Sequence, residues 1–233
     1  MFDHVTIRVA DVAASRHFYE LALGEPTYSG EYMEWDEFGL IDDTAVTRNL
    51  HVGFRAASPA DVDAWWHRLT GAGYESDGEP GPRPHYSEDY YGAFVRDPGG
   101  NSAEAVHKPS SSGTGRIDHL WLRTRDVAAQ RRFWETVAPL VGIRLKHDSP
   151  NWIQYVGADA TFSYVEGEPT EHVHLAFPAS DDATVAAFHQ AAVGAGFTDN
   201  GPPGERPHYH PGYVGAFVLD PNGNNIEVVC HHR

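Results

Sequence analysis

Residues 92–107 read GAFVRDPGGNSAEAVH, and residues 215–230 read GAFVLDPNGNNIEVVC, 123 positions later. Each stretch holds an apolar run, an Asp-Pro-x-Gly-Asn segment and a second apolar run that a glutamate interrupts. Pro, Gly and Asn favour turn geometry, so each stretch is predicted to be two strands joined by a turn. The duplication predicts an internally repeated fold.

The repetition extends over nearly the whole chain. The sequence DHV at 3–5 returns as DHL at 118–120, at an offset of 115, so the second copy carries an insertion of eight residues. Between the copies, residues 109–115 read PSSSGTG, a composition typical of a flexible linker. We therefore predict a first copy at 1–108, a linker at 109–115 and a second copy at 116–233.

Each copy alternates strand and helix signals. Residues 2–10 alternate apolar and polar side chains, as expected for a strand with one buried face. Asp11 and Ser58 are placed to cap the helices that follow, and Pro59 suits a first helical turn. Ser180 is the expected cap of the corresponding helix in the second copy. The pattern predicts an α+β fold of four strand-helix-strand units, with helices on one side of the sheets.

The composition argues for a folded protein without affinity for polyanions. Of the 233 residues, 41% are hydrophobic, and 33 acidic against 17 basic residues give a formal net charge of −16. Nucleic acids and anionic membranes both require basic clusters, so neither is an expected partner. The single cysteine, Cys230, indicates a reducing compartment. Without a signal peptide or an apolar run of membrane-spanning length, the expected location is the cytoplasm.

Polar side chains interrupt the apolar pattern of the predicted strands at matched places. They are His4, His51 and Glu104 in the first copy and His119, His174 and Glu227 in the second. Two imidazoles and one carboxylate can hold a divalent metal and leave coordination positions open. A single such histidine would more simply be a hydrogen-bonded group in a strand, but the recurrence of all three favours a metal. We expect one triad per copy, binding Fe, Zn, Mn, Ni or Co.

These motifs resemble the vicinal oxygen chelate superfamily. That group includes glyoxalase I, extradiol dioxygenases, fosfomycin-modifying enzymes, methylmalonyl-CoA epimerase and bleomycin-resistance proteins. The resemblance rests on the strand-borne Asp-His pair, the histidine of the mid-copy strand and the Asp-Pro-x-Gly-Asn segment before a glutamate. It implies four βαβββ modules that form two tandem glyoxalase-like domains, with curved mixed sheets around the metal and helices on the outer face.

The same resemblance implies roles for particular residues. The family's ligand positions fall on His4, His51, Glu104, His119, His174 and Glu227. Glyoxalase I and the epimerase use a fourth ligand, which falls on Glu37 in the first copy and on Thr161 in the second. Glu37 could ligate or lie in a solvated turn, and Thr161 is a poor ligand. The histidine and tyrosine signature of extradiol dioxygenases is not met, because Phe94 and Phe217 occupy that stretch.

Two further sets of residues are candidates for a role in the site. Arg8 and Arg123 lie four residues after the first-strand histidines, so they share their face and could bind a substrate carboxylate or enolate. A salt bridge to a strand neighbour is the alternative. The predicted loops over the site carry candidate acid-base residues, which could instead stack on a ligand or serve turn geometry. These are His85, Tyr86, His208 and Tyr209.

The expected function is that of a metal-dependent glyoxalase-like lyase or isomerase acting on a small oxygenated substrate, whose developing oxyanion charge the metal neutralises. A ring-cleaving dioxygenase is the alternative enzyme. A drug- or metabolite-sequestering binding protein of the bleomycin-resistance type is the alternative without catalysis. The substrate, the metal and the existence of a homodimer stay open at this stage.

Overall fold

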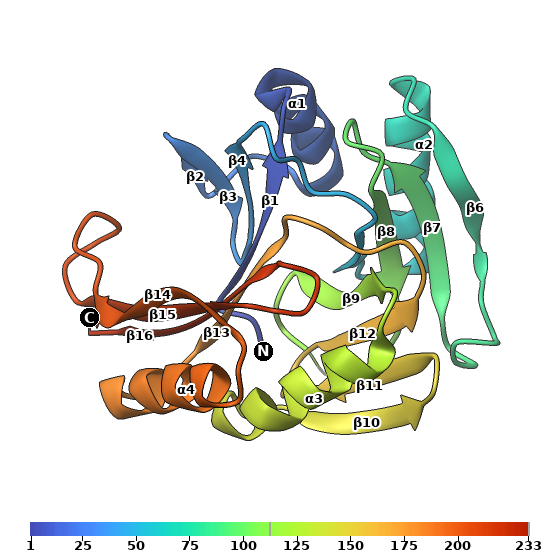
Figure 1. Cartoon of the computed structure of the whole chain (residues 1–233). Helices are drawn as coiled ribbons and strands as arrows, with labels where there is room; N and C mark the ends of the chain where they lie inside the picture. The colour runs from blue at the N-terminus through green and yellow to red at the C-terminus, as the bar shows by residue number, and fades with distance from the viewer. Residues whose placement is uncertain (112, 233) are drawn as a thin grey trace.

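The computed structural model describes residues 1–111 and 113–232 and confirms a mixed α+β fold (Figure 1). Within these residues, two eight-stranded mixed sheets carry four α-helices. Ser112 of the predicted linker and Arg233 lie outside the described residues. None of the described helices has the length and apolar character required to cross a membrane.

Each copy of the sequence consists of two βαβββ modules. The first copy contains β1 (His4–Val9), α1 (Val12–Leu23), β2 (Tyr28–Ser29), β3 (Tyr32–Trp35), β4 (Phe38–Asp42), β5 (His51–Arg55), α2 (Pro59–Gly71), β6 (Ser76–Pro82), β7 (Tyr91–Arg96) and β8 (Ser102–His107). The second contains β9 (Ile117–Thr124), α3 (Val127–Val137), the 3-10 helix η1 (Ala138–Leu140), β10 (Arg144–Ser149), β11 (Trp152–Val156), β12 (Thr161–Glu166), β13 (His174–Pro178), α4 (Asp182–Gly194), β14 (Thr198–Glu205), β15 (Tyr213–Leu219) and β16 (Asn225–His231).

Each sheet combines one module from each copy. The first sheet has the strand order β14-β15-β16-β13-β1-β4-β3-β2, and the second has the order β10-β11-β12-β9-β5-β8-β7-β6. The modules are joined by antiparallel pairing of β1 with β13 in the first sheet and of β5 with β9 in the second. The two sequence copies are therefore interleaved in space, and neither of them builds a sheet by itself.

Local sequence explains where the helices begin. The side chain of Asp11 accepts a hydrogen bond from the backbone N–H of Ala14 at the start of α1, and Ser58 caps α2. The expectation that Ser180 caps α4 is wrong. Asp181 accepts from the backbone N–H of Thr184 at 2.7 Å, because the helix begins at the following residue and Ser180 lies one position too early to reach that amide.

The two faces of each sheet differ in polarity, as the strand alternation predicts. On β1, Val5 and Ile7 are fully buried in the core with the helical residue Phe18. His4 and Thr6 occupy the opposite face and line a cavity. The helices therefore pack on the apolar face, and the predicted ligands lie on the other.

The Asp-Pro-x-Gly-Asn turns link the two sheets through buried aspartates. Asp97, between β7 and β8, accepts hydrogen bonds from the hydroxyl of Tyr19 on α1 at 2.9 Å and from the backbone N–H of Asn101 at 2.8 Å. Asp220, between β15 and β16, accepts from the hydroxyl of Tyr164 on β12 at 2.7 Å. Both carboxylates are almost fully buried, and each ties a turn of one sheet to a module of the other.

We expect Asp97→Ala and Asp220→Ala each to lower the free energy of unfolding by about 2–3 kcal/mol, because each leaves several buried donors without an acceptor. Asp42→Ala, at an exposed position, is the control and should change stability by less than about 0.5 kcal/mol. Urea denaturation followed by circular dichroism measures all three. Equal effects of Asp97→Ala and Asp42→Ala would contradict the anchoring role.

Candidate metal centres

The six predicted ligands form two clusters, and each cluster draws on both copies. The first centre consists of His4 on β1, His174 on β13 and Glu227 on β16; the second consists of His51 on β5, Glu104 on β8 and His119 on β9. The expectation of one triad per copy is therefore wrong. His4 lies in a different sheet from His51 and Glu104, because β1 and β5 each pair with a strand of the other copy.

In the first centre the three donor atoms converge at hydrogen-bonding separations. The Nε2 atoms of His4 and His174 are 3.0 Å apart, and Oε2 of Glu227 lies 3.0 Å from Nε2 of His174. Glu227 is 1% exposed, whereas His4 and His174 are 22% and 14% exposed. A cavity of about 550 Å³ opens onto this centre, so the two imidazoles lie at a surface that a small molecule can reach.

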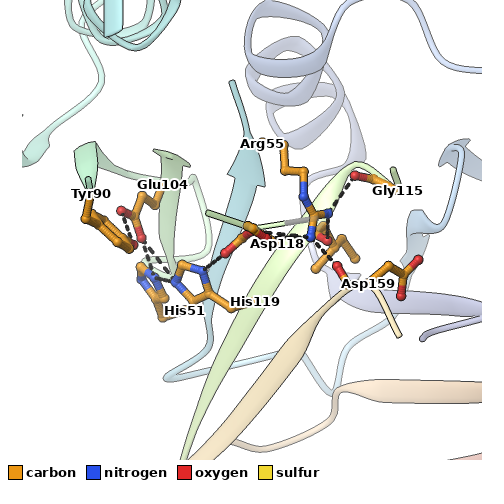
Figure 2. A network of polar contacts seen from close by, with 10 residues as sticks. His51, Arg55, Tyr90, Glu104, Gly115, Asp118, His119 and Asp159 are labelled. Carbon is orange, nitrogen blue, oxygen red and sulfur yellow. Dashed lines mark hydrogen bonds and ion pairs between the residues drawn. The ribbon is translucent and has the colours of Figure 1, made fainter. Parts of the chain in front are cut away.

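The second centre repeats this geometry (Figure 2). Nε2 of His51 lies 3.0 Å from Oε2 of Glu104 and 3.1 Å from Nε2 of His119, and Nε2 of His119 lies 3.2 Å from the same carboxylate oxygen. Glu104 is 1% exposed. A buried carboxylate facing two ring nitrogens is a donor set that suits a divalent transition ion.

Outer partners hold the imidazoles so that Nε2 faces each centre. Nδ1 of His4 is 2.9 Å from Oδ1 of Asp3 in the first centre, and Nδ1 of His119 is 3.0 Å from Oδ1 of Asp118 in the second. Such carboxylate–histidine pairs orient metal ligands in proteins. Nδ1 of His51 likewise lies 3.1 Å from the hydroxyl of Ser102. These contacts leave the Nε2 atoms available, so the residues fit a bound metal.

Sequence reasoning missed two tyrosines that hold the carboxylates. The hydroxyl of Tyr90 donates to Oε1 of Glu104 at 2.6 Å, and that of Tyr213 donates to Oε1 of Glu227 at 2.7 Å. Burial raises the pKa of Tyr90 and of Tyr213 far above the usual range, so both hydroxyls keep their protons and act as donors. Their common offset of 123 was a signal in the sequence that could have identified them.

Strand register explains the position of the glutamates and of the fourth ligand. His51 pairs with Ser102 across the parallel strands β5 and β8, and Glu104 follows two residues later on the same face. In the modules that begin with β1 and β9, we apply the same count from the strand partner of His4 or His119. The residue two positions further on is Gly39 on β4 in one module and Ser163 on β12 in the other. Thus neither Glu37 nor Thr161 occupies that position.

Glu37 is engaged elsewhere in the structure. It lies in the turn between β3 and β4, and its Oε1 accepts a hydrogen bond from the backbone N–H of Ile117 at 2.7 Å. Its side chain therefore fastens this turn to the start of β9.

The remaining predicted site residues differ in their placement. Arg8 lines the cavity of the first centre, where its guanidinium forms an ion pair with Asp43 at 2.6 Å. The backbone N–H of Arg123 donates to the hydroxyl of Thr170, and its exposed side chain is not among the residues that line this cavity. Arg8 thus forms a salt bridge, the alternative given for it, and it also lines the cavity, where its binding of a substrate anion stays a prediction.

The loop residues approach the centres through the buried tyrosines. Tyr209 lines the first cavity, and its ring centroid is 4.9 Å from that of Tyr213. The ring centroid of Tyr86 is 5.1 Å from that of Tyr90, which holds Glu104 in the second centre. The rings of His85 and His208 contact Tyr86 and Tyr209, at 4.1 and 4.3 Å respectively.

The ionisable groups of the second centre shift one another's pKa values. Burial by itself raises the pKa of Glu104, but hydrogen bonds from His119 and His51 outweigh it and lower the pKa to about 2. Burial by itself lowers the pKa of His119, but Asp118 and Glu104 raise it to about 9. Burial lowers the pKa of His51. At neutral pH, His119 therefore carries the proton and His51 is neutral.

The first centre shows the same division of roles. Burial opposes the charged form of His4, but Asp3 and Glu227 raise its pKa above the usual range. Burial lowers the pKa of His174. In both centres the histidine next to an aspartate is the one that favours its charged form.

Asp3 and Asp118, which contact His4 and His119, have different further partners. Asp118 faces the guanidinium of Arg55 at 3.3 Å and accepts from the hydroxyl of Ser111 at 2.8 Å. Figure 2 shows this chain of contacts, which continues from Arg55 to the carbonyl of Gly115. Asp3 instead lies 3.0 Å from Nε2 of His231. The second centre is therefore supported by a permanent positive charge and the first by the imidazole of His231.

The sequence matches one protein family over most of its length. Residues 25–105 and 116–228 match the family model described as the Glyoxalase/Bleomycin resistance protein/Dioxygenase superfamily. The chain belongs to this family, which confirms the resemblance seen in the sequence. No curated protein sequence matches the chain.

Solved structures share its fold at low sequence identity. The V278E mutant of glyoxalase I from Zea mays is 19% identical with a TM-score of 0.71, covering 99% of this chain and 92% of that one. A candidate dioxygenase from Bacillus subtilis is 13% identical with a TM-score of 0.68, covering 100% and 85%. These likenesses show a common architecture over the whole chain.

Pairs of substitutions test the grouping of ligands across the copies. His4→Ala/His174→Ala removes two ligands of one centre, so the protein should retain the metal of the second. His4→Ala/His51→Ala damages both centres and should lose the metal of both. Elemental analysis after loading with excess metal and desalting measures the difference. Greater metal retention in the second double variant than in the first would restore the grouping by copy.

The raised pKa of His119 predicts proton release on metal binding. Below pH of about 9 this ring is protonated in the metal-free protein, and a metal ligand must be neutral. We therefore expect the affinity of the second centre to increase with pH up to about 9. Calorimetric titration of the His174→Ala variant at pH 7, in buffers of different ionisation enthalpy, measures the released proton. Asp118→Asn should reduce the release, and no release in either protein would contradict the assignment.

Proposed function

We propose that the protein is a metal-dependent glyoxalase-like lyase or isomerase acting on a small oxygenated substrate. The observation that supports this best is the first centre, where two imidazoles and a buried carboxylate meet the cavity of about 550 Å³. A cavity of this size suits a small molecule. A divalent ion held by His4, His174 and Glu227 would polarise oxygen atoms of that molecule as a Lewis acid.

The protein's own groups have separate tasks in this proposal. Asp3 keeps the ring of His4 oriented, and the hydroxyl of Tyr213 holds Oε1 of Glu227 so that Oε2 faces the imidazoles. Arg8, at the cavity wall, is the proposed anchor for an anionic group of the substrate, with Asp43 fixing its position. Tyr209, which lines the cavity, is the proposed acid-base or stacking residue.

The second centre has matching groups in the same proposal. His51, Glu104 and His119 are the proposed metal ligands, and Tyr90 holds the carboxylate. The remaining proposed residues of this centre are His85, Tyr86 and Arg123. His208, whose ring contacts Tyr209, is the proposed counterpart of His85 in the first centre. Both centres are complete within one chain, so the proposed activity does not require a homodimer.

A ring-cleaving dioxygenase is the second candidate. Two histidines and one carboxylate with open positions are the ligand set of non-haem iron(II) oxygenases. The metal that the protein selects would distinguish the two reactions, since iron is expected for the oxygenase.

The decisive experiment begins with elemental analysis of untagged protein purified without added metal. Protein loaded with Ni, Zn, Mn or Fe(II) is then assayed with a hemithioacetal and, separately, with a catechol while oxygen uptake is recorded. We expect isomerisation of the hemithioacetal, and Glu227→Gln should remove the contribution of the first centre. Tyr213→Phe, which keeps the ring, should weaken metal binding about 10-fold.

Tyr90→Phe is the matched variant in the second centre and reports whether that centre contributes. Oxygen uptake with catechol would favour the dioxygenase. Absence of bound metal and of both reactions would leave the sequestering role of the bleomycin-resistance type.

A further inference from the structure

A third cluster of potential ligands lies away from both centres. Cys230 belongs to β16, and His232, two residues further along the chain, comes directly after that strand. Cys230 packs with the core residues Ile226 and Val228, so it faces away from Glu227 on the same strand. Asp182 is the first residue of α4, and its side chain meets His232 at this end of the sheet.

The three donor atoms converge. Oδ1 of Asp182 lies 2.7 Å from Nε2 of His232, and Sγ of Cys230 lies 4.0 Å from the same nitrogen. All three atoms lie within 4.8 Å of one another. The separations of 2.7 Å and 4.0 Å from Nε2 lie within the span of two zinc bonds, each about 2.0–2.3 Å long.

The chain around His232 is held in place. Its backbone N–H donates to the carbonyl oxygen of Gly212 at 2.9 Å. Gly212 has φ of 78°, and a Cβ there would lie 2.6 Å from the carbonyl oxygen of His232. The close approach of two backbones thus fixes the imidazole near α4.

Electrostatics at the thiol favour a cation. Cys230 is 3% exposed. The negative charges of Asp182 and Asp181 act on its thiol. Asp181 already caps α4 by accepting from Thr184, so Asp182 is the carboxylate free of helix capping.

The arrangement does not suit a nucleophilic cysteine. A thiol–imidazole–carboxylate relay uses both ring nitrogens of the histidine, one for each partner. Here Sγ and Oδ1 both face Nε2 of His232. Convergence on one point fits a shared ion instead.

We propose that Asp182, Cys230 and His232 form a third metal site, which takes a zinc-like divalent ion through one sulfur, one nitrogen and one oxygen. Thiolate selects borderline-soft ions, and three protein ligands leave one position for water. Such an ion would fasten the end of β16, the strand that carries Glu227, to the first turn of α4. The site is independent of the function proposed above.

Cobalt(II) provides a specific test, because Cys230 is the single cysteine among the 233 residues and the first and second centres contain no sulfur. Titration of the reduced protein with cobalt(II) should produce a saturable thiolate-to-cobalt charge-transfer band in the near ultraviolet, whatever share of the added cobalt the other two centres take up. Excess zinc should remove the band by displacement.

Three variants define the ligands. Cys230→Ser should abolish the band, and Asp182→Asn should weaken the cobalt affinity of the site at least about 10-fold. Asp181→Asn removes the same charge one residue away and keeps a good helix cap, so it should retain the band. Circular dichroism verifies that each variant is folded.

The outcomes separate this site from the other two. The band should persist in His51→Ala/His174→Ala, whose first and second centres are both damaged. Absence of the band in the folded wild-type protein would overturn the proposal and leave an Asp182–His232 ion pair beside a packed thiol. Equal loss in Asp181→Asn and Asp182→Asn would also overturn it, because the effect would then be one of general charge.

Discussion

Backbone pairing between the two copies is the constraint on which the rest of the structure depends. β1 joins β13 with His4 opposite Ala176, and β5 joins β9 with Gly53 opposite His119. Each join brings the first strand of one module beside a strand of the other copy. The first and the second centre each straddle such a join, so their donor atoms meet only when the strands pair in this register.

The second join depends on a glycine. A Cβ at Gly53 would overlap the ring of His119, which therefore lies against bare backbone. The first join has Ala176 at the corresponding place, opposite His4. The two joins have the same topology. They differ in the residue opposite the histidine, which is Ala176 for His4 and Gly53 for His119.

The segment that joins the two copies is also linked to the second centre. Arg55, at the end of β5, donates to the backbone carbonyls of Gly115, Ile117 and Asp159 and faces Asp118. One half-buried guanidinium thus fastens the start of the second copy to the first while it supports the aspartate that contacts His119. Pro178 stands at the equivalent position of the second copy, so the first centre has no such cation and uses His231 instead. The environment of the two centres has diverged although their ligands are the same.

The sequence by itself determined the elements, the repeat and the identity of the candidate ligands, since these follow from local spacing: alternation within β1, the cap at Asp11, and the recurrence of His51 and Glu104 as His174 and Glu227. Only the tertiary structure decided which ligands meet. Both copies carry the same pattern, so strands of either copy satisfy it equally well, and the pattern cannot distinguish pairing within a copy from pairing between copies. Contacts such as Arg55 with Asp118 and Glu37 with Ile117 were likewise beyond the sequence, because they join residues that approach each other only after the modules interleave.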